Sequence, residues 1–207
     1  AQEAAKIVPL DGAFLEALAA GSATPGGGSA AAFAGAAGAA LVAMVARLTV
    51  GKKKYATVEE RMQAIISQAD MLRGELTAGV EQDSAAYAQV MAAFKLPKET
   101  PEQQRERAAQ IQAATLVASQ VPLQTARLVV AVMALAKEVV EAGNVNALSD
   151  GGSAAALARA ALTGAGLNVR INARELEDKL AAKGLLEELS TLEQQAATME
   201  SAIRLSI

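Results

Sequence analysis

The chain has 207 residues, with 19 lysines and arginines against 22 aspartates and glutamates, and it contains no histidine and no cysteine. Without thiols and imidazoles, a disulfide framework, a zinc site of those ligands, a cysteine nucleophile and a histidine base are excluded, so any catalysis uses carboxylate, ammonium, phenol or hydroxyl groups. A formal net charge of -3 with both signs interspersed offers no basic surface, so we expect no nucleic-acid partner.

The composition is rich in alanine, which is the best helix former because it loses no side-chain entropy on folding. A chain of this length is within the size of one hydrophobic core, so we expect a single domain over residues 1–207. Alanine-rich helices gain stability by approaching one another closely, often across a subunit boundary. The sequence therefore predicts an all-α multi-helix bundle that forms an oligomer.

The stretch from Ala17 to Ala46 carries no charge and is the one candidate for a membrane segment. It contains Pro25, and its helical half is mostly alanine and glycine, which insert into membranes less readily than leucine or isoleucine. We therefore expect a buried helix and no membrane partner. The chain begins Ala1-Gln2-Glu3 without the pattern of an export signal, so we expect a cytoplasmic protein.

A glycine-rich loop separates the first two predicted helices. The first helix is predicted at about Leu10–Ala20, where Gly21 would end it. The loop Thr24–Ser29 then runs directly into a helix over Ala30–Val50, for which Ser29 is the predicted N-cap.

A compact cationic loop, Lys52-Lys53-Lys54-Tyr55, follows that helix. Lysines just past a helix C-terminus are favoured by the helix dipole. The loop is therefore either a solvated helix cap or a site for an anion.

A carboxylate interrupts the apolar face of the long helix predicted over Val58–Phe94. Apolar residues recur along it at steps of three and four, and Asp83 fills the one gap, three residues after Val80 and four before Tyr87. An inward carboxylate must be paired, hydrogen-bonded or protonated. Asp83 is therefore either a structural group, in an ion pair or capping another helix, or an acid that faces a cleft. The apolar positions are Met62, Ile65, Ala69, Leu72, Leu76, Val80, Tyr87, Val90 and Phe94.

Prolines in the middle of the chain indicate where predicted helices begin, end or bend. The long helix ends at Leu96-Pro97-Lys98, and Thr100-Pro101-Glu102-Gln103 has the residues of a capping box with proline at the first helical position. The next helical pattern contains Pro122, which lacks the amide hydrogen that a helix needs, so we predict a kink or break there. The pattern ends at Gly143.

The same six letters, Gly-Gly-Ser-Ala-Ala-Ala, occur at Gly27–Ala32 and at Gly151–Ala156. A polar linker over 143–152 precedes the second copy, so each copy is predicted to place a glycine turn at a helix N-terminus. Such a turn binds anions through backbone amides or allows close packing of the helix start, and both alternatives stand.

The remaining elements are predicted as a helix over Ser153–Gly166, an extended piece over Leu167–Asn172, and two closing helices over Glu175–Ala182 and Leu185–Leu205. The extended piece would display Asn168 and Asn172. The apolar face of the last helix is predicted to be core or a dimer seam.

Taken together, these motifs form an ordered series that resembles the cyclodeaminase/cyclohydrolase family of one-carbon folate metabolism. That family comprises the C-terminal half of formiminotransferase-cyclodeaminase and free-standing methenyltetrahydrofolate cyclohydrolases. The resemblance extends from about Phe14 to the C-terminal helices. The matching residues are Thr24–Ala32, Met44-Val45, Leu48-Thr49, Gly51–Tyr55, Asp83, Leu96–Lys98, Val121–Leu123, Gly143-Asn144, Ser149-Asp150, Asn168-Val169 and Ile171-Asn172.

The resemblance implies an all-α homodimer of antiparallel helices with a folate substrate, polyglutamylated or not, and no cofactor or metal. It also implies that Asp83 is the catalytic acid, because the family's proton donor precedes Ala-Phe/Tyr and Leu-Pro-Lys, here Ala86-Tyr87 and Leu96–Lys98. The lysines are assigned to the glutamate tail of folate, and the asparagines and Asp150 to the pterin edge or a water. The predicted binding residues are Pro25, Gly26, Gly27, Gly28, Ser29, Lys52, Lys53, Lys54, Tyr87, Lys98, Asn144, Asn146, Asp150, Asn168 and Asn172.

Three functions compete for this sequence. The first is methenyltetrahydrofolate cyclohydrolase, because the chain holds only this one domain. The second is formimidoyltetrahydrofolate cyclodeaminase, because the motifs are common to both activities. The third is a non-catalytic helical dimer that binds folate or acts as a scaffold, suggested by Ser153 at a position where the family often has an apolar residue.

Overall fold

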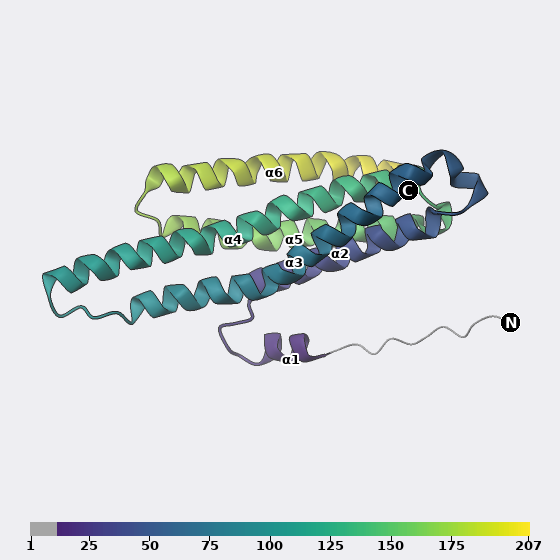
Figure 1. The fold of residues 1–207 in the computed structure, drawn as a ribbon. Helices are drawn as coiled ribbons and strands as arrows, with labels where there is room; N and C mark the ends of the chain where they lie inside the picture. The colour runs from purple at the N-terminus through teal and green to yellow at the C-terminus, as the bar shows by residue number, and fades with distance from the viewer. Residues whose placement is uncertain (1–11) are drawn as a thin grey trace.

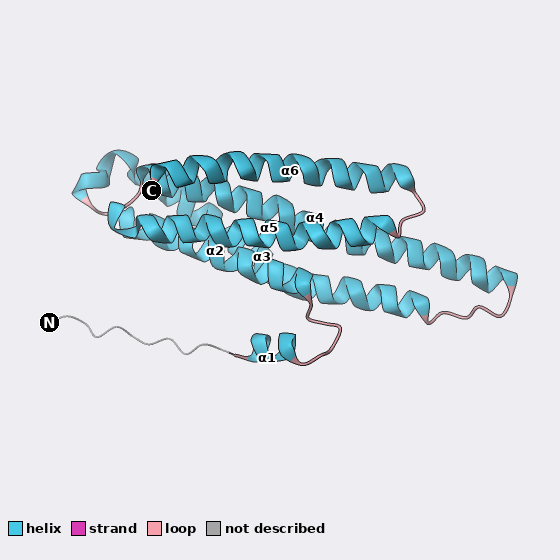
Figure 2. Ribbon diagram, turned by 180° about the vertical axis from the view of Figure 1, so that it is seen from behind, coloured by secondary structure: helices cyan, strands magenta, loops and turns pink. Residues whose placement is uncertain are grey.

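The computed structural model describes residues 12–207, and within this range every regular element is a helix, which confirms the predicted all-α class (Figure 2). The long helices lie side by side in an elongated bundle, and the short α1 lies at its side (Figure 1), where Phe14 stacks on Phe33 of α2. Leu10 and Asp11 of the first predicted helix lie outside the described residues. The elements are α1 (Ala13–Ala19), α2 (Gly27–Thr49), η1 (Lys53–Val58), α3 (Glu59–Phe94), α4 (Pro101–Ala142), η2 (Val145–Ala147), α5 (Leu148–Arg174) and α6 (Lys179–Ser206).

Helix α2 is the centre of the bundle and packs against α3, α4 and α5. Its glycines permit this because they remove side-chain bulk on different sides. A Cβ atom on Gly35 would lie 2.6 Å from Val129 Cγ1 of α4, and one on Gly38 would lie 3.0 Å from the carbonyl oxygen of Ala154 in α5. The predicted close approach of small-residue helices is therefore confirmed within the chain.

The same helix is the one element among residues 12–207 that is long and apolar enough to cross a membrane. In the structure, 56% of its most apolar window is buried inside the bundle. Val42 and Val45 are completely buried by the surrounding helices. This burial is that of a core helix, as the sequence predicts.

The boundaries of α3 and the start of α4 agree with the sequence prediction. Helix α3 begins at Glu59 and ends at Phe94. At the start of α4, Thr100 Oγ1 accepts a hydrogen bond from the Gln103 amide at 3.2 Å, and Gln103 Oε1 accepts one from the Thr100 amide at 3.2 Å. The predicted capping box is therefore confirmed. It was predictable because both partners lie within one helical turn.

Along the second half of α3, the buried face differs from the predicted apolar face. From Gly79 onward the buried positions are Gly79, Ala86 and Ala93. Tyr87 and Phe94, which were predicted to face inward, are 41% and 49% exposed. A straight helix drifts by about 20° per seven residues relative to a strict heptad, so a stripe extrapolated over a long helix loses its register.

The predicted break at Pro122 does not occur, because α4 is one uninterrupted helix with Pro122 buried inside it. Packing against α3, α5 and α6 holds the chain helical on both sides of the proline. The carbonyl of Ala118, which cannot receive a helical hydrogen bond from a proline, instead accepts one from Asn172 Nδ2 at 2.7 Å.

The C-terminal half also differs from the prediction. Helix α5 begins at Leu148 and runs through the residues that were predicted as a linker and as an extended piece, and α6 replaces the two predicted closing helices. Tertiary packing outweighs the low helix propensity of glycine here, because a Cβ on Gly151 would lie 2.7 Å from Val140 Cγ2. Gly152 likewise faces Ile207. The second Gly-Gly-Ser-Ala-Ala-Ala copy is therefore a packing site inside a helix.

Candidate active site

Asp83 is a half-buried carboxylate of α3 that faces the first turn of α2. Ser29 Oγ lies 2.9 Å from Asp83 Oδ2 and 3.0 Å from the carbonyl oxygen of Val80, and it is the donor in both contacts. A hydroxyl has one hydrogen, so the two acceptors share it. These contacts place Oδ2 beside Ser29, and Oδ1 lies beside Gly28.

Gly28 is the reason that Asp83 can approach α2 so closely. A Cβ atom at this position would lie 2.0 Å from Asp83 Oδ1 and 2.6 Å from its Cγ. Any other residue would displace the carboxylate. The first turn of a helix also carries a partial positive charge, which attracts a carboxylate at this position.

The environment of Asp83 decides between the structural alternatives left open by the sequence. Within residues 12–207, Asp83 takes part in no salt bridge, so the ion-pair alternative is wrong. The carboxylate does lie at a helix N-terminus, but its hydrogen-bond donor is the Ser29 hydroxyl rather than a backbone amide. The group is held in place while one oxygen remains available to a ligand.

Ser29 is not where the sequence predicted it to be. The N-cap of α2 is Gly26, and Ser29 lies inside the first turn with 0% of its surface exposed. Its hydroxyl contacts Val80, Asp83 and Ser84 of α3. The prediction that Ser29 is the N-cap is therefore wrong. Its predicted contact with the substrate stays a prediction, and Ser29 is not among the pocket-lining residues.

A pocket of about 340 Å³ opens in front of Asp83 and is formed by α2, α3, α4, α5 and the loop before α2. Several predicted residues from distant parts of the chain line it together, namely Gly26, Gly27, Gly28, Asp83, Tyr87, Asn168 and Asn172. Pro25 lies in the same loop but is not among the lining residues. The other lining residues are Ala23, Thr24, Ala86, Val90, Ala118 and Ile171.

Asn168 and Asn172 lie one turn apart on α5 rather than on an extended strand, so both reach the same pocket. Asn168 Nδ2 donates to the Gly164 carbonyl at 2.9 Å, and Asn172 Nδ2 donates to the Ala118 carbonyl at 2.7 Å. Because a carbonyl only accepts, each contact determines the orientation of the amide. Each asparagine is left with its side-chain oxygen as the acceptor.

Sequence reasoning missed the part of the pocket that α4 contributes. Ala118 lines the pocket through a backbone oxygen, and alanine carries no chemical signal in a sequence. The available signal was Pro122, four residues later, because a proline inside a helix frees the carbonyl of the residue four positions before it.

Six other predicted residues lie at the opposite end of α2. Lys52 and its two neighbours precede or begin η1, Asn144 and Asn146 form the turn at η2, and Asp150 is in the first turn of α5. A helix of 23 residues separates this end from the pocket, which is about 34 Å at 1.5 Å per residue. The predicted site residues Lys52, Lys53, Lys54, Asn144, Asn146 and Asp150 therefore do not line the Asp83 pocket of the same subunit.

The residues at that end make structural contacts instead. Asn144 Nδ2 donates to the Leu48 carbonyl at 3.0 Å, and its amide donates to Thr49 Oγ1 at 2.9 Å, which joins the end of α4 to the end of α2. Tyr55 Oη accepts from the Val145 amide at 3.0 Å. This backbone hydrogen bond lowers the pKa of the Tyr55 phenol, and the nearby Lys54 acts in the same direction.

Lys98 lies in the loop that joins α3 to α4. The end of α3 is 11 residues beyond Asp83, or about 17 Å along the helix, so Lys98 is also remote from the pocket. Among the pocket-lining residues that the structure describes there is consequently no cation.

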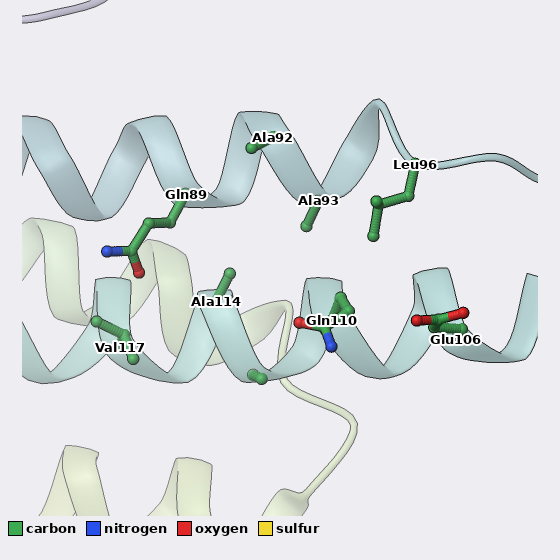
Figure 3. A pocket seen from close by; sticks show the side chains of 9 residues that line it. Gln89, Ala92, Ala93, Leu96, Glu106, Gln110, Ala114 and Val117 are labelled. Carbon is green, nitrogen blue, oxygen red and sulfur yellow. The ribbon is translucent and has the colours of Figure 1, made fainter.

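A second hollow of about 490 Å³ lies between the end of α3 and the first half of α4 (Figure 3). Figure 3 shows Ala93 of α3 and Ala114 of α4 pointing towards the space between the two helices, with Gln89, Gln110 and Glu106 also lining the hollow. Glu106 is its one ionisable lining residue, and Glu106 is exposed. The Asp83 pocket, with a held carboxylate and oriented amides, is therefore the better candidate for catalysis.

Comparisons with known proteins show the family to which the chain belongs. The family model for formiminotransferase-cyclodeaminase matches residues 12–191. The methenyltetrahydrofolate cyclohydrolase of Methylorubrum extorquens is 45% identical over 190 residues, which are 92% of this chain and 91% of that protein. The formimidoyltransferase-cyclodeaminase of Rattus norvegicus is 34% identical over 92% of this chain but only 35% of its own length.

The fold has a solved counterpart. The crystal structure of formiminotetrahydrofolate cyclodeaminase from Thermotoga maritima superposes with a TM-score of 0.85 and 30% sequence identity. The match covers 93% of this chain and 92% of that one.

Proposed function

Because the chain belongs to the formiminotransferase-cyclodeaminase family, we propose that it is a methenyltetrahydrofolate cyclohydrolase, which converts 5,10-methenyltetrahydrofolate to 10-formyltetrahydrofolate. The observation that carries the proposal is the 45% identity to the Methylorubrum extorquens cyclohydrolase over nearly the full length of both chains. The Asp83 pocket supports it, because it holds one carboxylate with a free oxygen beside oriented hydrogen-bond acceptors.

Asp83 acts first as a general base in this proposal. The carbon between N5 and N10 of the substrate is an electrophilic amidinium carbon. A water held by Asp83 Oδ1 adds to this carbon, and its proton passes to the carboxylate, so the charge of the amidinium is neutralised. Positioned proton transfer of this kind contributes about 10² to 10⁴ in rate.

Asp83 then acts as a general acid. The protonated carboxyl gives its proton to N5 while the bond between N5 and the carbon breaks. The hydroxyl proton leaves as the formyl carbonyl forms, so one proton is released over the whole reaction. Ser29 holds Oδ2 throughout, which keeps Oδ1 near the reacting atoms.

The runner-up function, formimidoyltetrahydrofolate cyclodeaminase, uses the same site. N10 attacks the formimino carbon, and ammonia leaves after it has received a proton from Asp83. The Thermotoga maritima structure, whose own description names this activity, favours the alternative at 30% identity. The difference between 45% and 30% identity favours the cyclohydrolase.

A paired assay tests the choice between these two functions. We expect the purified protein to accelerate the loss of the near-ultraviolet absorbance of methenyltetrahydrofolate. We expect much slower formation of the same chromophore, with ammonia release, from formimidoyltetrahydrofolate. Acceleration of the second reaction alone would assign the chain as a cyclodeaminase, and acceleration of neither would favour the non-catalytic dimer.

We further propose that the active unit is an antiparallel homodimer. Large apolar side chains on the pocket-forming helices remain exposed in one subunit, including Ile171 at 61%, Leu167 at 56% and Phe33 at 48%. Large apolar side chains that stay exposed on neighbouring helices are typical of an interface. An antiparallel partner would bring its Lys52–Lys54 loop towards the Asp83 pocket of the first subunit. The residues of the first subunit that line this pocket include no cation for the carboxylates of the folate tail.

Sedimentation tests the dimer. We expect the mass of two 21.1 kDa chains, and we expect Leu167→Glu to shift the protein towards monomer and to reduce activity. Leu180→Glu is the matched control, because Leu180 is an exposed leucine of α6 that lies outside the pocket. A stable monomer with full activity would contradict the shared site.

A further inference from the structure

Pro122 creates a gap in the backbone hydrogen bonding of α4 at the pocket. Proline has no amide hydrogen, and its ring presses on the carbonyl four residues earlier. In α4 that carbonyl belongs to Ala118, which is one of the pocket-lining residues. The proline therefore frees a carbonyl oxygen on the side of α4 that faces the pocket.

Asn172 of α5 occupies this gap. Its Nδ2 donates to the Ala118 carbonyl at 2.7 Å, and the two residues are 54 positions apart in the chain. A partly buried carbonyl oxygen rarely stays without a hydrogen bond, and the Asn172 amide supplies the one that Pro122 cannot. Since the contact uses Nδ2, the side-chain oxygen of Asn172 is the end turned away from α4.

Asn168 and Asn172 donate their side-chain hydrogen bonds to different helices. Asn168 Nδ2 donates to Gly164 O, four residues earlier in its own helix, at 2.9 Å. That contact is available to an asparagine on any helix face. Asn172 instead reaches across to a different helix, and in a regular α4 it would have to share the Ala118 carbonyl with the helix's own amide hydrogen.

We propose that Pro122 is a positioning residue for substrate recognition, which frees the Ala118 carbonyl so that Asn172 presents its oxygen to an N–H group of the bound folate. The proposal rests on the proposed folate substrate. The pterin ring carries N–H donors along one edge, and an amide oxygen is the acceptor that matches them. The loss of one helical hydrogen bond in α4 is thus linked to the orientation of a binding group.

Pro122→Ala tests the proposal, because it returns an amide hydrogen to α4 and removes the ring from the Ala118 carbonyl. We expect KM for methenyltetrahydrofolate to rise about three- to tenfold, as for one weakened hydrogen bond, with kcat within about twofold. The melting temperature rises or is unchanged, because proline is the poorest residue in a helix interior. Pro101→Ala is the control, since a proline at the first helical position of the same helix frees no such carbonyl, and it leaves KM unchanged.

Asn172→Ala completes the cycle and covers the case in which Pro122→Ala does not fold. We expect Asn172→Ala to raise KM at least as much as Pro122→Ala, and the double variant to be no worse than Asn172→Ala alone. Additive effects, or an unchanged KM in either single variant, would overturn the proposal.

A measurement without substrate separates this inference from the proposed function. In ¹⁵N-labelled, ligand-free protein we expect the side-chain amide signals of Asn172, identified by their loss in Asn172→Ala, to shift and to exchange faster with solvent in Pro122→Ala. Unchanged signals would overturn the coupling whatever the enzyme acts on. If the signals change in Pro122→Ala but the wild-type protein converts neither folate, the coupling stands and only the proposed function is refuted.

Discussion

Replacing Asp83 with asparagine is expected to lower kcat for methenyltetrahydrofolate by about 10² to 10⁴-fold. The amide has nearly the same shape, and Ser29 Oγ, now 2.9 Å from Oδ2, would still have an acceptor within reach. What the variant loses is the capacity to take and return a proton. We therefore expect KM to change little, because the loss falls on the transition state rather than on binding.

Glu81→Gln is the matched control for Asp83→Asn. Glu81 is an exposed carboxylate on the same helix, two residues away, and it does not line the pocket. We expect its activity and melting temperature to equal those of the wild type. If Asp83→Asn retained full activity, Asp83 would be a structural partner of α2, and the reaction would need another acid and base.

Gly28→Ala is expected to reduce activity about as much as Asp83→Asn, although it leaves the carboxylate in the sequence. The new Cβ would lie 2.0 Å from Asp83 Oδ1, closer than any contact that unstrained atoms make, so the side chain of Asp83 must move. A displacement of about 1 Å at a catalytic group is enough to cost about a hundredfold in rate. We expect the bundle to stay folded, because the change is one methyl group at the end of α2.

Gly74→Ala is the control for Gly28→Ala. Gly74 lies within α3, and a Cβ there would have no neighbour within 4 Å. Alanine is favoured over glycine in a helix by about 0.5 to 1 kcal/mol, so we expect a slightly raised free energy of unfolding and unchanged kinetics. Wild-type kinetics in Gly28→Ala, with thermal unfolding also unchanged, would show that the close approach of Asp83 to α2 does not matter for catalysis.

Local signals made α3 and the start of α4 predictable. The capping box of Thr100 and Gln103 is complete within four residues, and the periodicity of α3 by itself singles out Asp83. The same reasoning failed for α5, where glycines suggested a linker. Gly151 and Gly152 lack side chains, which leaves room for Val140 and Ile207, and a helix can contain glycine when packing requires it.

Only some of the predicted binding residues lie together in the structure. The glycine loop, Asp83, Tyr87 and the two asparagines of α5 share one pocket. The residues Lys52–Lys54, Asn144, Asn146 and Asp150 are separated from it by the length of a helix, because α2 places its two flanking loops at opposite ends of the bundle (Figure 1). Their chemistry was visible in the sequence, but their distance from Asp83 was not.

By itself, the sequence determined the helical class, the boundaries of α3 and the presence of a carboxylate on a face that is otherwise apolar. These properties follow from residue propensity and from periodicity within a few turns of helix. Only the tertiary structure decided that Ser29 hydrogen-bonds to Asp83, and that Asn172 of α5 hydrogen-bonds to the Ala118 carbonyl, four residues before the proline in α4. Each of these contacts joins residues 54 positions apart, so each depends on how whole helices pack rather than on any local pattern.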